Sequence, residues 1–236
     1  MLEILSLITP ADYAALGFTL AGVVLLQTLI ERPNRWRPSV TVLMRAYRRD
    51  WMREFVTRQP RMYDATVLDG LRQGITFYAS TCMLALGGGL ALLGDTQPLE
   101  GLAHSFALPD APALLTKAKI LFVLAFVVNG FLKFVWAHRL FGYCSILMAS
   151  VPNDPDHPHA MTRAMQAAEV NITAAKNYNR GLRSVYFAIG ALGWLVGPLG
   201  LALAMAMTFA TLIRREFISQ SRVAIVAGLK DQDPMV

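Results

Sequence analysis

Two polar side chains stand inside an otherwise apolar run and are the first candidates for chemistry. Asn129 lies about ten residues into a run that begins near residue 120, and Lys133 follows one helical turn later. An ionisable group within a membrane helix is by default a functional candidate. On a helix the two side chains share one side. They could line an anion path or pack against another helix, and Lys133 could instead reach the nearby water interface.

Side chains used by enzymes and metal sites form no recognisable constellation elsewhere. The acidic and histidine residues of 154–159 are held apart by two prolines, which keep that loop extended. Ser80 and Thr81 lack the GxSxG turn that presents a nucleophilic serine. Haem between membrane helices commonly has two histidine ligands, but only His138 lies at the end of an apolar run. We therefore expect a protein that is not an enzyme, with no catalytic residue, no metal and no cofactor.

The composition indicates a membrane protein. Of 236 residues, 55% are hydrophobic and only 16% are charged, whereas about a quarter of a soluble domain is charged. Such hydrophobicity excludes a disordered chain. The two cysteines, Cys82 and Cys144, lie in apolar runs, which excludes a disulfide scaffold.

Four apolar stretches have the length of a membrane span, which is about 20 residues. They predict an all-α, polytopic transmembrane helical bundle forming one membrane domain over 1–236. The first 30 residues contain no Lys or Arg, so the first stretch is a retained helix rather than a signal peptide. The predicted spans are 11–30, 74–94, 120–137 and 185–213.

Basic residues predict the orientation, because cytoplasmic loops are enriched in Lys and Arg. The segments 31–73 and 138–184 hold ten and five of them, so both are expected in the cytoplasm. Four spans then place both termini outside the cytoplasm, including the basic tail 214–236, and we expect a bacterial inner membrane. The alternative is a re-entrant hairpin at Pro198, which has Gly197 and Gly200 beside it.

Residues 40–58 have a helical period with two faces. Arg45, Arg49 and Arg53 share one face, and aromatic residues including Trp51 lie on another. This arrangement suits a helix in the membrane interface that binds lipid or a partner. A basic face that is merely solvated is the alternative. The net charge of +6 comes without a phosphate-binding loop or zinc-finger spacing, so we expect no nucleic-acid partner.

A second cytoplasmic helix is predicted to start near Ala160, where small and apolar residues recur at spacings of three and four. Glycines repeat in the same way along the predicted fourth span. Small residues on one face let membrane helices approach closely, which predicts a compact bundle or an oligomer contact. These helix-packing positions are Gly190, Gly193, Gly197 and Gly200.

Three separated motifs carry a resemblance to a known family. They are DATVLDGLRQG at 64–74, KFVWAHRLFGY at 133–143 and NYNRGLRSVYF at 177–187. In order and spacing the chain resembles, over residues 10 to 222, the four-span membrane family catalogued as domain of unknown function 599. The resemblance implies an integral membrane fold and no known activity. It directs attention to a polar motif before the last span, made of Asn177, Asn179, Arg180 and Arg183.

The expected function is therefore that of a non-catalytic membrane scaffold or accessory subunit. Its partners would be membrane lipid, in particular anionic lipid, and a membrane protein complex or a second copy of the chain. The alternative is an oligomeric anion channel or transporter, with Asn129 and Lys133 along its path.

Overall fold

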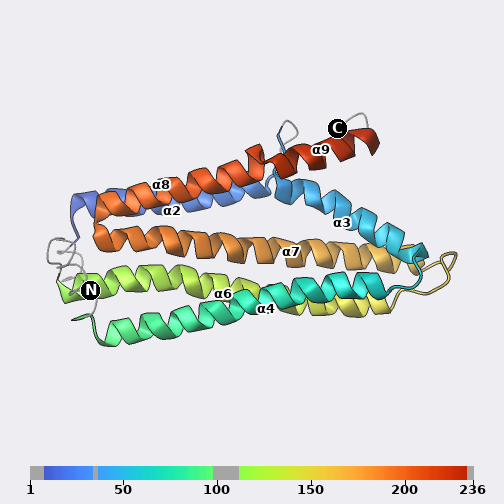
Figure 1. Ribbon diagram of the computed structural model, residues 1–236, viewed down its shortest axis with the longest axis horizontal. Helices are drawn as coiled ribbons and strands as arrows, with labels where there is room; N and C mark the ends of the chain where they lie inside the picture. Colours follow the sequence, from blue (N-terminus) through green and yellow to red (C-terminus); the bar gives the residue numbers. More distant parts are fainter. Residues whose placement is uncertain (1–7, 34–36, 98–111, 233–236) are drawn as a thin grey trace. The chain divides into compact units, whose positions relative to one another are not determined.

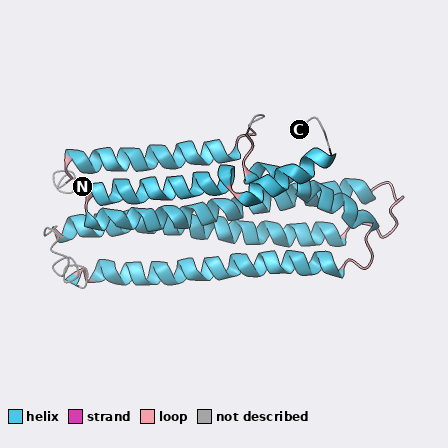
Figure 2. Cartoon of the chain, turned by 45° about the horizontal axis from the view of Figure 1, so that its top comes forward, coloured by secondary structure: helices cyan, strands magenta, loops and turns pink. Residues whose placement is uncertain are grey.

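The computed structural model describes residues 8–33, 37–97 and 112–232, and every regular element in these ranges is a helix (Figure 2). The predicted all-α fold class is confirmed. In chain order (Figure 1), the elements are α2 (Pro10–Glu31), α3 (Val40–Thr57), α4 (Met62–Gly94), α6 (Ala113–Ala149), α7 (Ala160–Ala191), the 3-10 helix η1 (Leu192–Val196), α8 (Pro198–Ile213), the π-helix η2 (Arg214–Ile218) and α9 (Gln220–Gln232).

Three of these helices, α2, α4 and α6, are long and apolar enough to cross a membrane. They contain the predicted spans 11–30, 74–94 and 120–137, and they mark the chain as a membrane protein. With 33 and 37 residues, α4 and α6 extend about 50 and 55 Å, at 1.5 Å per residue. The hydrocarbon layer is roughly 30 Å thick, so both helices are longer than a span requires.

The predicted fourth span, 185–213, is not one continuous helix, and the predicted count of four spans is not confirmed. The chain turns between α7 and α8, where Gly197 has a φ of 126°. This conformation favours glycine because it lacks a Cβ. Pro198 then opens α8, where a missing N–H costs nothing. The hairpin that the sequence left as an alternative is therefore present.

The helices pack into two compact units, each assembled from three separate stretches of chain. The sequence predicts a single membrane domain over 1–236. We call Met1–Leu29, Thr81–Phe131 and Leu182–Ile213 the apolar unit, and Ile30–Ser80, Leu132–Gly181 and Arg214–Val236 the basic unit. The basic unit carries 19 basic and 11 acidic residues, a net charge of +8, whereas the apolar unit carries three and five, a net charge of −2.

Aromatic side chains link the helices of the apolar unit. Phe209 of α8 lies with its ring centroid 5.7 Å from that of Phe18 on α2 and 6.1 Å from that of Phe187 on α7. Phe122 of α6 packs edge-on against Trp194 of η1, with centroids 5.4 Å apart. Apolar side chains also face outward, and Leu84 is 78% exposed. An exposed apolar surface of this kind suits contact with lipid.

A polar lock fixes the hairpin turn to the start of α2. Asp12 and Thr9 form a capping box, with Thr9 N donating to Asp12 Oδ2 at 3.1 Å and Asp12 N donating to Thr9 Oγ1 at 3.3 Å. Trp194 Nε1 donates to Asp12 Oδ1 at 2.7 Å. Asp12 is only 4% exposed, so water has little access to its carboxylate. The donors from Thr9 and Trp194 satisfy it instead.

The basic unit contains the C-terminal tail. Tyr47 OH of α3 donates to the carbonyl of Ile225 at 3.1 Å, and Arg222 Nε donates to the carbonyl of Pro38, also at 3.1 Å. These contacts place the tail beside α3 within the basic unit. The expectation that put the tail and the segment 31–73 on opposite sides of a membrane assumed a continuous fourth helix, which the structure does not have.

Candidate functional site

Each member of the predicted arginine face has a partner within the basic unit. Arg45 Nη2 donates to the carbonyl of Glu31 at 3.2 Å. Arg49 forms an ion pair of 2.7 Å with Glu169 of α7, and Arg53 forms one of 2.5 Å with Asp50 of its own helix. The face therefore serves partly to hold α3 in place. Its contact with lipid or a partner stays a prediction.

Trp51, predicted to bind lipid with these arginines, also makes an internal contact. Its indole Nε1 donates to Asp64 Oδ1 at 2.6 Å, and Arg58 pairs with the same oxygen. Asp64 is fully buried at the start of α4. The carboxylate thus ties the end of α3 to α4.

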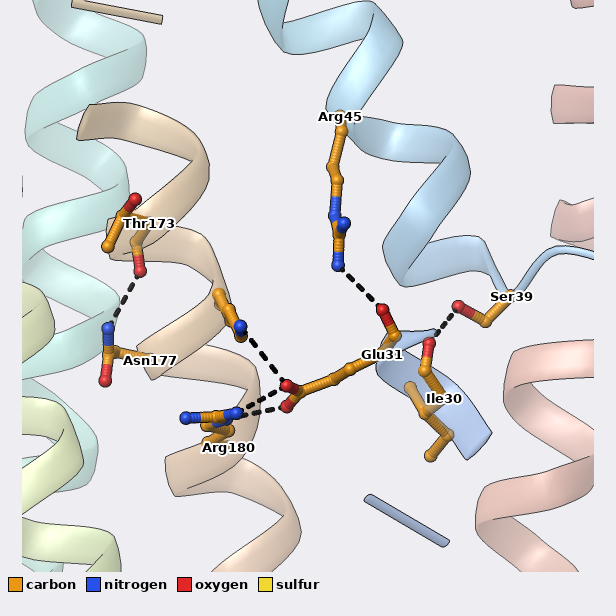
Figure 3. Close-up of polar contacts among 8 residues, drawn as sticks. Ile30, Glu31, Ser39, Arg45, Thr173, Asn177 and Arg180 are labelled. Carbon is orange, nitrogen blue, oxygen red and sulfur yellow. Dashed lines mark hydrogen bonds and ion pairs between the residues drawn. The ribbon is translucent and has the colours of Figure 1, made fainter. Parts of the chain in front are cut away.

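Glu31, at the end of α2, forms ion pairs with two basic side chains of α7 (Figure 3). Its carboxylate accepts from Arg180 through Nε, at 2.6 Å, and through Nη2, a bidentate arrangement typical of strong Arg–carboxylate pairs. Lys176 Nζ lies 3.4 Å from Glu31 Oε2. The hydrogen bonds that Arg180 donates to Glu31 raise the pKa of Arg180, despite the opposing effect of burial. Arg180 of the predicted polar motif is thus a partner of Glu31.

The other members of that motif have separate surroundings. Asn177 is buried and donates to the carbonyl of Thr173 at 2.9 Å, on a side of α7 away from Glu31 (Figure 3). Asn179 lines the pocket described below. Arg183 is buried and belongs to the apolar unit. The four residues do not form one site.

A polar pocket of about 260 Å³ lies between α3, α7 and η2 of the basic unit. We call it the Arg48 pocket. It brings Arg45 of the predicted face together with Asn179 of the predicted motif. Its lining residues are Val40, Thr41, Met44, Arg45, Arg48, Ile172, Ala175, Lys176, Asn179 and Glu216.

Arg48 contributes a partly buried guanidinium to this pocket. It donates to Asn171 Oδ1, and the amide of Asn171 in turn donates to Cys144 Sγ at 3.6 Å. Burial lowers the pKa of Arg48, because desolvation disfavours the charged form. The Arg48 guanidinium therefore has a fixed position and a neutral hydrogen-bond partner.

Glu216 supplies the negative charge of the Arg48 pocket, but it already has a structural task. Its carboxylate accepts from Thr41 N at 3.1 Å and from Thr41 Oγ1 at 2.9 Å, at the start of α3. Carboxylates stabilise helix N-termini, where N–H groups lack partners. Glu216 lies in the π-helix η2, and π-helical turns are frequent at functional sites.

Arg48, Lys176 and Glu216 were not among the site residues predicted from the sequence. The available signal was the spacing of three between Arg45 and Arg48 on α3 and between Lys176 and Asn179 on α7, which places each pair on one side of its helix. Nothing in the sequence showed that these two sides meet.

A second pocket of about 450 Å³ in the basic unit is lined by Arg61, Asp69 and Arg72 together with other polar and apolar residues. Arg61 donates through Nη1 and Nη2 to the carbonyls of Val151 and Pro152, at 2.8 and 2.9 Å. Its guanidinium therefore holds the loop after α6.

The two residues of the predicted intramembrane pair belong to different units. Asn129 lies in the apolar unit and donates to Ser184 Oγ at 2.9 Å, and Ser184 donates to the carbonyl of Phe126 at 2.7 Å. Polar side chains commonly join membrane helices in this way. Lys133 lies in the basic unit and is half-buried, and no hydrogen bond or ion pair of its ammonium is found in the described part of the chain.

The four glycines lie around the hairpin instead of along one helix. A Cβ on Gly193 would lie 2.5 Å from the carbonyl oxygen of Gly200, and the reverse distance is also 2.5 Å. A Cβ on Gly190 would meet Met205 Sδ at 2.6 Å. The packing that Gly190, Gly193 and Gly200 permit is therefore between α7–η1 and α8 of a single chain, whereas a Cβ on Gly197 would have no neighbour within 4 Å.

The loop with clustered acids and histidines forms local turns. Asp156 N donates to Asp154 Oδ1 at 3.0 Å, and His159 N donates to His157 Nδ1 at 3.2 Å. Within the ranges that the structure describes, no group of three or more His, Cys, Asp or Glu side chains could hold a metal ion.

A known protein family matches most of the chain, including the candidate site residues described above. The family model "Protein of unknown function, DUF599" matches residues 14–221. The chain belongs to this family. The match includes α3, both arms of the hairpin and every residue that lines the Arg48 pocket. Comparisons with curated proteins and with solved structures give no match.

Proposed function

We propose that this DUF599 member is a non-catalytic membrane scaffold or accessory subunit, whose basic unit binds anionic lipid or an acidic surface of a protein partner. The observation that carries the proposal is the separation of charge, +8 in the basic unit against −2 in the apolar unit. Basic residues near a membrane surface are attracted to anionic lipid by about 1 kcal/mol each.

We also propose an orientation, in which the basic unit lies in the cytoplasm. The supporting argument is the preference of Lys and Arg for the cytoplasmic side. The C-terminal tail contacts α3 and so lies there too. The N-terminus lies outside, because α2 crosses the membrane before the basic unit begins. A bacterial inner membrane stays a prediction.

The alternative of an anion channel or transporter also stays a prediction. It requires Asn129 and Lys133 to face one water-filled path. The hydrogen bond from Asn129 to Ser184 favours a packed contact between α6 and α7. We therefore keep the scaffold or accessory role as the leading proposal.

Purification at native expression level tests this proposal. The full-length protein is extracted from its own membrane in mild detergent, and the proteins and lipids that accompany it are identified by mass spectrometry. We expect a partner protein in fixed ratio, or anionic lipid enriched over its share of the membrane. A symmetric homo-oligomer without either, which carries a selective anion flux in proteoliposomes, would favour the channel instead.

A further inference from the structure

The Arg48 pocket holds more positive charge than its own residues neutralise. Arg45, Arg48 and Lys176 line it, against the single carboxylate of Glu216. Lys176 has an acidic partner, since its ammonium lies 3.4 Å from Glu31. Arg45 and Arg48 instead donate to neutral oxygens, a backbone carbonyl and the amide of Asn171. Within the described part of the chain neither of these two arginines forms an ion pair.

The pocket also offers suitable donors. A guanidinium has five N–H groups in a planar fork, and only one hydrogen bond of each arginine is found among the described residues. The side chain of Asn179 adds a further polar group to the lining. Two arginines beside a lysine are the set that proteins use for phosphate, because the forks bind its oxygens in pairs. A bound anion would also offset the cost of burying Arg48.

The size and location of the pocket limit the ligand. Its volume of about 260 Å³ lies below the roughly 300–1,000 Å³ of sites for drug-sized ligands, so it fits one phosphate with a short substituent. Glu216 follows the last residue of α8 by three positions, and Glu31, which bonds Arg45, is the last residue of α2. Glu216 of the pocket thus closely follows one apolar helix, and Arg45 bonds the last residue of another, and lipid headgroups lie beyond the ends of such helices.

We propose that the Arg48 pocket binds a phosphate group, presented by an anionic lipid headgroup or by a small soluble phosphate ester. The inference rests on the proposed function, in which the basic unit is the part that meets anionic ligands, and it names the ligand class and the residues. Arg45 and Arg48 bind the phosphate oxygens, and Lys176 adds charge at the rim.

The test uses the full-length protein in a non-ionic detergent. One arm titrates inorganic phosphate and glycerol 3-phosphate and follows the thermal unfolding temperature. The other arm adds phosphatidylglycerol or phosphatidylcholine and counts bound lipid by native mass spectrometry. Stabilisation by the soluble probes identifies a soluble ester as the source, and selective retention of phosphatidylglycerol alone identifies a lipid headgroup.

Three variants assign the binding to the pocket. Arg48→Gln should weaken it about tenfold or more, since hydrogen bonds to charged groups are the stronger ones. Lys176→Gln, at a side chain that is 40% exposed, should fold normally and also weaken binding. Arg163→Gln is the control, because Arg163 lies on α7 outside the pocket and bonds the carbonyl of Ser150. It should bind like the wild type.

The pocket assignment is overturned if no phosphate probe binds the wild type, or if both pocket variants bind as it does. Different results would contradict the pocket assignment and the proposed function. If wild type and pocket variants retain phosphatidylglycerol equally, the basic unit binds anionic lipid elsewhere. If native purification yields neither partner nor anionic lipid, the proposed function fails, whatever the soluble probes show.

Discussion

Gly193 is the position where one added methyl group tests the hairpin most directly. Its Cβ would lie 2.5 Å from the carbonyl oxygen of Gly200 and 2.8 Å from the Cβ of Ala204. The first of these neighbours is backbone, so no side-chain rotation relieves the contact. Gly193→Ala should therefore push the two arms of the hairpin apart.

The expected cost follows from this overlap. Overpacking a close contact costs about 1–3 kcal/mol. For a chain of this length, 1 kcal/mol shifts the thermal midpoint by about 2–4 °C. Gly193→Ala should therefore lower the Tm of the detergent-solubilised protein by about 2–12 °C, as measured by intrinsic tryptophan fluorescence. Gly193→Leu should lower it further.

The matched control is Gly88→Ala in α4, where an added Cβ has no neighbour within 4 Å. Alanine is a better helix former than glycine by up to about 1 kcal/mol, so this variant should keep or raise the Tm. An unchanged Tm for both Gly193→Ala and Gly193→Leu would refute the close approach of the two arms.

Three further perturbations test other parts of the structure. Asp12→Ala removes the carboxylate that accepts from Thr9 in the capping box of α2 and from Trp194, so thermal unfolding should show a loss of about 1–2 kcal/mol. Trp194→Phe in that background should add little, and full additivity of the two losses would contradict the link between Asp12 and Trp194. Single cysteines at Gln97 and Ser221, both exposed, should react differently with an impermeant thiol reagent: the first in intact cells, the second only after lysis. Equal labelling in intact cells would contradict the cytoplasmic tail. Lys133→Met should leave stability and anion flux near those of the wild type, whereas the channel alternative predicts a lost or altered flux.

The sequence predicted the helical membrane class and three of its spans because a long apolar run signals a buried or lipid-facing helix without any partner. The same signal failed at 185–213, where both arms of the hairpin are apolar and hydropathy passes through the turn unchanged. Gly197 and Pro198 marked the turn. The segment 31–73 has ten basic residues and the tail 214–236 has four. These numbers could not show on which side of the membrane the tail lies.

The candidate site was harder to predict because its parts come from distant stretches. Arg45 and Asn179 were singled out separately, for their periodic face and for a family motif. Glu169 lies 120 positions from the arginine it pairs with, and helical periodicity carries no information on such pairs. In the sequence, Glu31 marks the polar end of a predicted span. In the structure its carboxylate accepts hydrogen bonds from Arg180, which lies 149 positions later.

The contact between Glu216 and Thr41 has a consequence for synthesis. Ser39 caps α3 locally through Val42 N, but the carboxylate that accepts from Thr41 lies 175 positions after it, so α3 emerges from the ribosome long before this second acceptor exists. At roughly 5–20 residues per second, the wait is on the order of ten seconds or more. We expect the basic unit to close only as translation ends, after α2, α4 and α6 have entered the bilayer.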